Sequence, residues 1–289
     1  MKLTKALFAA AMLAMLGACA SKGPTAPSAA APESDAALAA AVAGAWRTPE
    51  NVARDRYRKP ADALAFWGLA PGMTILELSP GGGYWTEMLA PYAAATGGRY
   101  IATAADLGNP ELSQAAKETR AKFEQRFADA ALYGNVQYVN FGPKSKGLGP
   151  DASVDFVLNG RNIHNWMAGG ILDRVLGDAF AVLKPGGILA IEEHRNAEGT
   201  PQDPKATTGY VTEAFVIEAA TRAGFVLEAR SEILANPADD RDHPFGVWTL
   251  PPILRTAPQG QPANPAFDSA PYKAIGESDR MALRFVKPR

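Results

Sequence analysis

The sequence contains one cysteine, Cys19, in 289 residues. No intramolecular disulfide can form, and no catalytic or metal-binding thiol exists elsewhere in the chain. Histidine is scarce, with three residues, so a site that needs imidazole has few candidates. There is also no basic surplus, because 29 lysines and arginines face 30 acidic residues, for a formal net charge of −1. Nucleic-acid binders carry such a surplus, so the composition predicts no nucleic-acid partner.

The apolar run near the start of the chain, Ala6 to Leu16, is too short to cross a bilayer, which takes about 20 apolar residues. It follows Lys2 and Lys5 and ends in small residues, which is the pattern of a signal peptide. We predict a signal peptide over residues 1–18. Its removal takes away two positive charges and changes the formal net charge from −1 to −3.

The segment Leu16-Gly17-Ala18-Cys19 resembles the bacterial lipobox, in which the cysteine is acylated and becomes the first residue of the mature protein. The resemblance implies a lipid anchor at Cys19, a lipid membrane as partner, and a place on the periplasmic face of the bacterial cell envelope. Because Ala20 and not aspartate follows the cysteine, it further implies the outer membrane. The alternative is an ordinary secretory signal cleaved near Ala18, with Cys19 incidental.

The next stretch is rich in alanine, serine and proline and has few charges, so it cannot bury enough apolar surface to become ordered. We predict a flexible tether over residues 19–44, in which 36–45 could form a short helix because alanine is the best helix former. Residues 45–289 are long enough for one medium-sized domain with its own core.

Short apolar segments alternate with helical patterns along this domain. Met73 to Leu78 is apolar and ends in Ser79-Pro80-Gly81-Gly82-Gly83, which predicts a buried strand stopped by a glycine-rich turn. Further strands are predicted at residues 99–104, 136–141, 154–159, 188–192, 225–231 and 281–287. Helices are predicted at residues 84–92, 109–131, 171–183 and 211–223, and over 48–69 with a break at Lys59-Pro60. The alternation predicts an α/β fold with a doubly wound, mostly parallel sheet of about seven strands.

In an open α/β sheet, ligands bind at the carboxyl ends of the strands, where a glycine-rich turn lets the backbone approach closely. The dinucleotide fingerprint does not fit, because Thr86 stands where its last glycine would be. The lysine and hydroxyl residue of a P-loop are absent. A nucleophile elbow around Ser79 would need a glycine at the position of Glu77.

The turn and its flanks, Glu77-Leu78-Ser79-Pro80-Gly81-Gly82-Gly83, resemble the acidic-x-Gly-x-Gly-x-Gly motif of class I S-adenosylmethionine-dependent methyltransferases, with Ser79 in place of the first glycine. Leu183 to Leu189 resembles the L-K-P-G-G-x-L segment of that family. Three further segments are similar to a subset of exported methyltransferases: Pro80 to Thr86, Arg161 to Trp166, and Glu193 to Arg195. The resemblance covers residues 46–289. It implies a Rossmann-like fold of the class I methyltransferase type, S-adenosyl-L-methionine as cofactor, and a small-molecule or envelope-associated acceptor.

The resemblance also implies roles for residues. The cofactor-binding candidates are Glu77, Ser79, Gly81, Gly83, Tyr84, Asp106, Asn159 and Arg161. Glu77 would accept a hydrogen bond from the methionine ammonium, and the glycines would give room. The acid that usually ends the second strand and binds the ribose falls near Ala104, so Asp106 is the candidate substitute.

A neutral histidine can act as a base near pH 7, so His164 is the catalytic candidate. Asn162, Trp166 and His194 are candidates for the substrate side. The alternative is that Asn162 and His164 cap the following helix while Trp166 packs in the core. His164 and His194 could join a carboxylate in a metal site, but no metal-ligand spacing supports this, and no metal is predicted.

Two questions stay open at this stage. Arg54, Arg56, Arg58 and Lys59 form either a solvated face, a contact to lipid phosphates or, in part, a wall of the pocket. The same fold could also serve a non-catalytic small-molecule-binding or envelope interaction protein, because the periplasm is not an obvious source of S-adenosylmethionine. If Glu77 and Asp106 point into one pocket, cofactor binding is favoured, whereas an Asp106 that points to solvent favours the binding protein.

Overall fold

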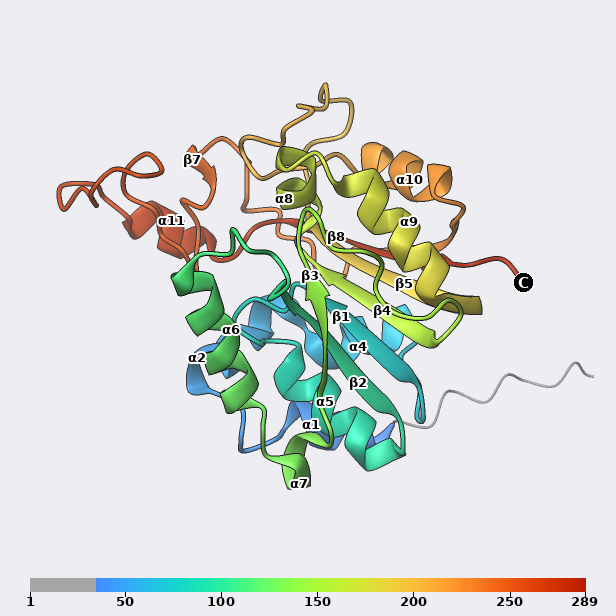
Figure 1. The fold of residues 1–289 in the computed structure, drawn as a ribbon. Coiled ribbons are helices and arrows are strands. Elements are labelled where there is room, and N and C mark those ends of the chain that lie inside the picture. Colours follow the sequence, from blue (N-terminus) through green and yellow to red (C-terminus); the bar gives the residue numbers. More distant parts are fainter. Residues whose placement is uncertain (1–34) are drawn as a thin grey trace, which may run out of the picture. The chain divides into compact units, whose positions relative to one another are not determined.

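The computed structural model describes residues 35–289, so the predicted signal peptide and Cys19 lie outside the described residues. Seven strands form one sheet in the order β3-β2-β1-β4-β5-β8-β6 (Figure 1). They are β1 (Thr74–Leu78), β2 (Arg99–Ala105), β3 (Gln137–Phe141), β4 (Val154–Gly160), β5 (Leu183–His194), β6 (Val226–Ser231) and β8 (Arg280–Val286). The pairs from β3 to β5 are parallel, and β8 lies antiparallel between β5 and β6. This confirms the predicted doubly wound, mostly parallel sheet.

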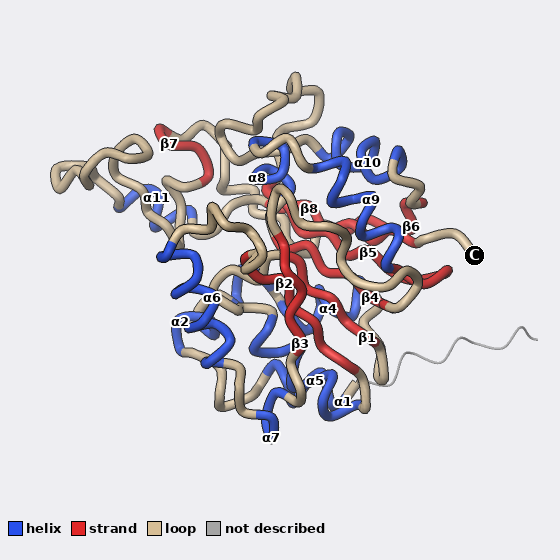
Figure 2. Tube along the Cα trace, viewed as in Figure 1, coloured by secondary structure: helices blue, strands red, loops and turns tan. Residues whose placement is uncertain are grey.

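Helices cover both faces of the sheet (Figures 1 and 2). One face carries α1 (Ala36–Val42), α4 (Pro60–Trp67) and α5 (Thr86–Thr96), and the other carries α8 (Ile163–Ala168), α9 (Leu172–Val182) and α10 (Glu213–Arg222). In β1, Ile75 packs into the core on the side of α1, α4 and α5, and Leu76 packs into the core on the side of α8, α9 and α10. Because both faces are buried, the strand is a continuous apolar run in the sequence.

The domain begins earlier than predicted. The compact unit starts at Asp35 and not at residue 45, because α1 packs on α5 and α4. The Asp35 carboxylate caps α1 and also accepts a hydrogen bond from the Tyr92 hydroxyl at 2.5 Å. Leu38 and Ala41 are buried in this contact. The last part of the predicted tether is therefore an ordered element of the domain.

Several helix boundaries differ from the predicted ones because single capping residues set where the helices begin. The helix predicted over 109–131 is divided into α6 (Gln114–Arg126) and α7 (Ala130–Tyr133), because Ser113 and Asp129 cap new starts. The helical segment before β1 contains α2 (Pro49–Val52) and α3 (Asp55–Arg58) as well as α4. Lys59, with a left-handed φ of 40°, joins α3 to α4. The short strand β7 (Pro244–Val247) and helix α11 (Ala270–Ile275) were not predicted. Within residues 35–289, no helix has the length and apolarity that a membrane span requires.

Candidate functional site

Two cavities open at the carboxyl ends of the strands and meet at the glycine turn after β1. The first, about 380 Å³, is lined by Arg54, Arg58 and Arg161, and we call it the arginine cavity. The second, about 450 Å³, is lined by Ala104, Ala105, Phe123 and Phe141, among others, and we call it the apolar cavity. Ser79, Pro80 and Gly81 line both. This edge of the sheet is where open α/β folds bind ligands.

The backbone of the turn explains its sequence. Ser79 has a φ of 49° and Gly81 a φ of 57°, both in the left-handed region that favours glycine. Ser79 therefore takes, at a cost, a conformation that a glycine would take freely. A Cβ atom added to Gly81 would meet no atom within 4 Å, so the turn borders open space.

Gly83 does not belong to this site, contrary to the prediction. It lines neither cavity, and a Cβ atom added to it would lie 2.7 Å from the Phe127 ring. Its φ of 80° and this contact show that Gly83 allows Phe127, next to the end of α6, to pack against the turn.

Glu77, a cofactor-binding candidate, lines the arginine cavity at the end of β1, although its side chain is almost completely buried. Its Oε2 atom accepts hydrogen bonds from the Tyr100 hydroxyl at 2.5 Å and the Thr86 hydroxyl at 2.9 Å. Burial raises the pKa of Glu77 to about 7, and the two hydrogen bonds only partly oppose that rise. At neutral pH the carboxyl is thus shared between its charged and neutral forms, and a nearby ligand ammonium would favour the charged form.

Two predicted cofactor ligands lie outside both cavities. After Ala105, the Asp106 carboxylate accepts a hydrogen bond from the Gly108 amide at 2.9 Å and closes its own turn. The lining of the apolar cavity holds Ala104 and Ala105 at the place of the ribose acid, and Asp106 is not part of it. Asn159 is buried at the end of β4, and neither atom of its amide has a hydrogen-bond partner among residues 35–289.

Two arginines from the segment before β1 reach the arginine cavity. Arg54 and Arg58 line it, whereas Arg56 and Lys59 are exposed. The Glu277 carboxylate accepts hydrogen bonds from Arg54 at 2.5 Å and from the Nε of Arg58 at 2.9 Å. The sequence left three alternatives for this segment. For Arg54 and Arg58, the alternative of a pocket wall is the one that the structure shows.

Arg161 and Tyr84, two of the cofactor-binding candidates, also line the arginine cavity. Arg161 has a φ of 62°, and its amide donates to the Glu192 carbonyl at 2.7 Å. The Tyr84 hydroxyl donates to Asp55 at 2.7 Å, while the Arg58 guanidinium lies 4.3 Å from the centre of the Tyr84 ring. A left-handed φ in a residue other than glycine marks backbone strain, which proteins keep where the surroundings demand it.

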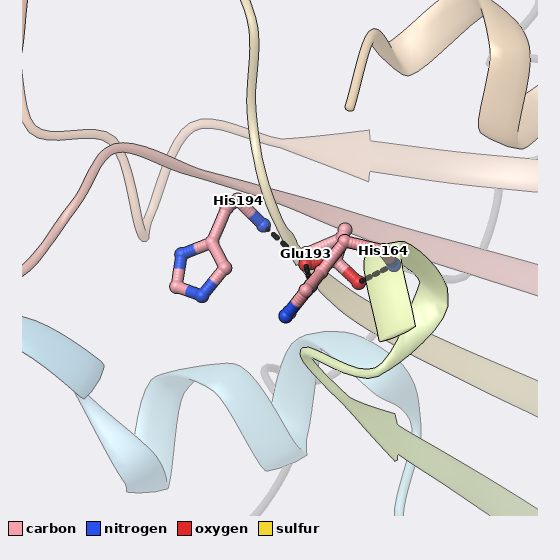
Figure 3. A group of neighbouring side chains, drawn as sticks. All are labelled: His164, Glu193 and His194. Carbon is pink, nitrogen blue, oxygen red and sulfur yellow. Dashed lines mark hydrogen bonds and ion pairs between the residues drawn. The ribbon is translucent and has the colours of Figure 1, made fainter. Parts of the chain in front are cut away.

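His164 lies at the start of α8 and lines the arginine cavity. Figure 3 shows its ring beside the Glu193 carboxylate. Its Nδ1 atom is 2.9 Å from a Glu193 oxygen, so a neutral ring keeps Nδ1–H for the carboxylate and leaves Nε2 as the acceptor. Glu193 also accepts from the amides of Ile163 at 2.6 Å and His194 at 2.8 Å. Neither Asn162 nor His164 caps α8 through its side chain; Glu193 instead accepts the amides of Ile163 and His164 at the start of the helix.

Glu193 was not predicted to act at the site. The sequence marked it only as part of the segment with His194 and Arg195, and nothing in the strand pattern shows that it meets a residue after β4. The pairing of β4 with β5 brings the two ends together, with Gly160 opposite Glu192.

The substrate-side candidates are placed differently from one another. His194 lines the arginine cavity, and its Nδ1 lies 2.5 Å from the Ser278 hydroxyl. Burial, with His164 and nearby arginines, lowers the pKa of His194 well below its ordinary value, so the ring is neutral. Asn162 also lines the cavity and donates to the Gly160 carbonyl at 3.1 Å. Trp166 lines neither cavity and packs in the core, which is the alternative and not the predicted role.

His164, Glu193 and His194 offer atoms within 4.8 Å of one another that could hold a metal ion. The Glu193 oxygens, however, already accept from the His164 ring and three backbone amides. The guanidiniums that line the same cavity would oppose a cation. The carboxylate therefore acts as the orienting partner of His164, and we assign no metal to this cluster.

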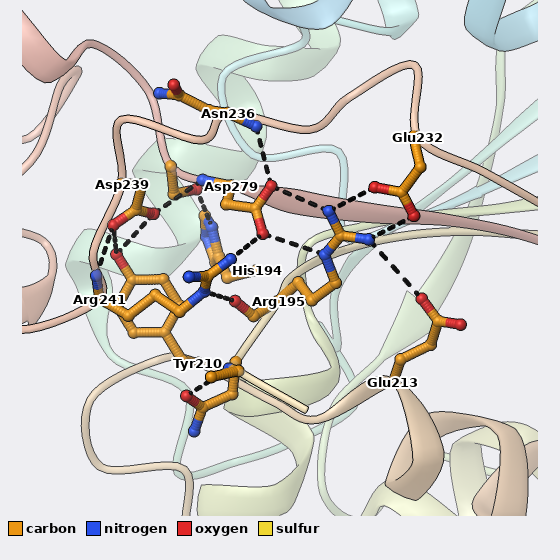
Figure 4. A network of polar contacts seen from close by, with 12 residues as sticks. His194, Arg195, Tyr210, Glu213, Glu232, Asn236, Asp239, Arg241 and Asp279 are labelled. Atoms are coloured by element: carbon orange, nitrogen blue, oxygen red, sulfur yellow. Dashed lines mark hydrogen bonds and ion pairs between the residues drawn. The ribbon is translucent and has the colours of Figure 1, made fainter. Parts of the chain in front are cut away.

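A network of ion pairs holds the end of β5 to the loop before β7 (Figure 4). The buried Asp279 carboxylate binds Arg195 at 3.0 Å, Arg241 at 2.6 Å and the amide of Asn236 at 2.8 Å. His194 directly precedes Arg195 in the chain. The network therefore fixes the end of β5, which carries His194. Beyond this loop, a third cavity of about 550 Å³ shares His164 and Trp248 with the arginine cavity.

No protein-family model matches the chain. Three solved structures show the level of similarity found. A SAM-dependent methyltransferase from Aquifex aeolicus is 20% identical, with 63% of this chain and 88% of that chain covered and a TM-score of 0.46. An S-adenosylmethionine-dependent methyltransferase from Mesorhizobium loti is 16% identical, with 78% and 96% covered and a TM-score of 0.45. The [4+2]-cyclase SpnF is 19% identical, with 87% and 91% covered and a TM-score of 0.48.

The sheet has the mostly parallel, Rossmann-like α/β architecture that the sequence predicted. Such a fold hosts many functions, so the reaction has to be inferred from the side chains of this chain.

Proposed function

We propose that this protein binds S-adenosyl-L-methionine and transfers its methyl group to a small or envelope-associated acceptor. The observation that carries the proposal is the pair of cavities that meet at Ser79–Gly81, with His164 on the wall of one of them. The apolar cavity suits an adenine and its sugar, because Ala104, Phe123 and Phe141 offer apolar surface. The arginine cavity places Glu77 where it can accept from the amino-acid ammonium.

The open space at Gly81 lets a ligand pass from one cavity to the other against the backbone. When bound, S-adenosylmethionine supplies a methyl group on a sulfonium, and transfer forms a bond from the acceptor to the methyl carbon as the carbon–sulfur bond breaks. The protein holds the acceptor in line and thereby supplies most of the rate gain. The Nε2 atom of His164 takes the proton of an O–H or N–H acceptor, and Glu193 stabilises the imidazolium that results.

A second function has one observation in its favour. Asp106 lines neither cavity, and no carboxylate stands in the lining beside Ala104 and Ala105. By the criterion set from the sequence, this favours a non-catalytic protein that binds a small molecule on the same fold. The ordered His164–Glu193 pair favours catalysis, because a binding protein has no need of a base.

Calorimetric titration of the purified full-length chain with S-adenosylmethionine and S-adenosylhomocysteine tests the proposal. Saturable heat with a Kd below 1 mM is the expected result, on the order of −4 kcal/mol or stronger. No heat at millimolar ligand would refute the methyltransferase assignment. If the cofactor binds saturably but a His164→Gln variant methylates as fast as the unchanged protein, the role of His164 as the base is refuted.

We further propose that Cys19 is acylated and anchors the protein at the periplasmic face of the outer membrane. The support is the lipobox-like segment Leu16 to Cys19 and the alanine that follows it. Metabolic labelling with a fatty-acid analogue should mark the unchanged protein in outer-membrane fractions and leave a Cys19→Ser variant unmarked. Label on Cys19→Ser, or none on the unchanged protein, would contradict the anchor.

A further inference from the structure

The arginine cavity holds more positive charge than its own carboxylates balance. Around it lie four guanidinium groups and two carboxylates, which are those of Arg54, Arg58, Arg161, Arg280, Glu192 and Glu277. Glu77, which also lines the cavity, is partly charged at neutral pH; even when it is counted in full, one positive charge remains in surplus. Asp55 does not correct this, because it is already paired with Arg47 at 2.6 Å. Unbalanced charge away from bulk water is costly, so an anion that enters this space is favoured.

Arg58 presents the surplus most directly. Its side chain is completely buried, its Nε is bound to Glu277, and one face lies over Tyr84. Both terminal nitrogens, Nη1 and Nη2, lack a hydrogen-bond partner among residues 35–289. Burial, followed by the charge of Arg161, lowers the pKa of Arg58 to about 9. A guanidinium with two free N–H groups on one edge matches the two oxygens of a carboxylate or phosphate.

The proposed cofactor does not supply the missing charge. S-adenosylmethionine carries one carboxylate, one ammonium and one sulfonium, so its net charge is positive and the surplus grows when it binds. The balancing anion has to arrive with the acceptor. The cavity wall formed by Trp248, Pro251 and Ile253 is apolar, so it can contact the uncharged body of such a molecule.

We infer that the acceptor is a small organic anion, whose carboxylate or phosphate is held by Arg58 and Arg161 while its apolar part lies against Trp248. This inference rests on the proposed function. It places the negative group of the acceptor between α3 and the end of β4, and its nucleophilic atom toward His164. The cavity of about 380 Å³ fits a compact molecule and excludes a folded protein as the group that enters.

Thermal unfolding of the full chain tests the anion site with sodium benzoate and inorganic phosphate as probes, against sodium chloride at equal ionic strength. At about 100 times its Kd, an oxyanion should raise the Tm by on the order of 5 °C more than chloride does. Arg58→Met should lose this extra shift, and Arg56→Met should keep it. Arg56 is the matched control, because it lies on the same helix, carries the same charge and is exposed. Arg161→Gln, with a side chain that is 21% exposed, serves as the second variant if Arg58→Met does not fold.

The same titrations with saturating S-adenosylhomocysteine locate the source of the anion. An oxyanion shift that persists beside the cofactor product supports an anionic acceptor. Loss of the shift in its presence would overturn the inference, because the arginines then hold the carboxylate of the cofactor itself. Equal shifts from chloride, or shifts that survive both variants, would also overturn it. If S-adenosylhomocysteine does not bind and the oxyanion shift remains, the proposed methyl transfer is refuted, whereas the anion site is supported.

Discussion

At the scale of single residues, His164 has a defined orientation because Glu193 is held in place by three backbone amides. A His164→Gln variant should retain its Kd for S-adenosylhomocysteine within about twofold. Its methylation of an oxyanion acceptor should fall by about 10² to 10⁴, the usual contribution of a positioned base. Single-turnover rates and calorimetry measure the two quantities separately. A parallel loss of binding would mean that His164 holds the ligand instead of accepting a proton.

Glu77 makes stability depend on pH in an uncommon direction. Its pKa is about 7 in the folded protein and near 4.5 ordinarily, so folding favours the protonated form. The unchanged protein should therefore lose stability as pH rises from about 4.5 to about 7, by on the order of 3 kcal/mol. Glu77→Gln stays neutral and should show a smaller loss over this window and be more stable than the unchanged protein at pH 8. Urea unfolding between pH 5 and pH 8 checks this, and parallel curves for the two proteins would refute it.

The sequence located the residues that directly follow a strand and missed those that reach the site from elsewhere. Glu77, Arg161 and His194 were found because the ends of parallel strands share one edge of the sheet. The orientation of Asp106 could not be found, because a side chain that closes its own turn leaves no periodic signal. The sequence also could not decide whether Arg58 reaches the cavity, because that depends on how α3 packs.

At the scale of elements, the glycine turn after β1 decides whether the two cavities are continuous. Gly81→Ala places a methyl group in open space and forces alanine into a left-handed φ, so stability should fall by about 1–2 kcal/mol. Gly170→Ala is the matched control, with a φ of 66°, open space around its Cβ position and no contact with either cavity. Both variants should lose similar stability in urea, and only Gly81→Ala should weaken binding of S-adenosylhomocysteine. Equal binding by the two would show that the ligand does not pass over the turn.

All seven strands of the sheet were predicted because each contains a short apolar run, although β3 and β6 have no fully buried residue. The helices were less predictable, since their ends depend on single caps such as Ser113 and Asp129. The strand β7 is short and lies outside the main sheet, and its partner Thr208 comes from a distant loop. Elements of this kind are set by tertiary contacts that a local pattern does not record.

At the scale of the whole molecule, buried ion pairs tie β5, β8 and the loop before β7 into one frame. Burial opposes the charge of Asp279, but hydrogen bonds from Arg195 and Arg241 hold its pKa below the ordinary value. A lowered pKa adds stability above the ordinary value of 3.8, and this is lost as pH falls through the folded value.

Asp279→Asn should lower the free energy of unfolding at pH 7 by about 1–3 kcal/mol, because it removes the carboxylate that accepts from Arg241 and Arg195, although Arg195 keeps its contact with Glu232. It should also flatten the acid limb of the stability curve below about pH 4. Asp242→Asn, an exposed position in the neighbouring loop, should change stability by less than about 0.5 kcal/mol. Urea unfolding from pH 3 to pH 7 measures both. Equal stability of the two variants would show that the network does not hold the frame.

The central claim is that the two cavities form one site for S-adenosylmethionine. A crystal structure of the full chain grown with S-adenosylhomocysteine tests it most directly. We expect the adenosine against Ala104 and Phe141, the sulfur beside Gly81, and the amino-acid group near Glu77. Adenosine bound elsewhere, or both cavities empty of ligand at millimolar concentration, would contradict it.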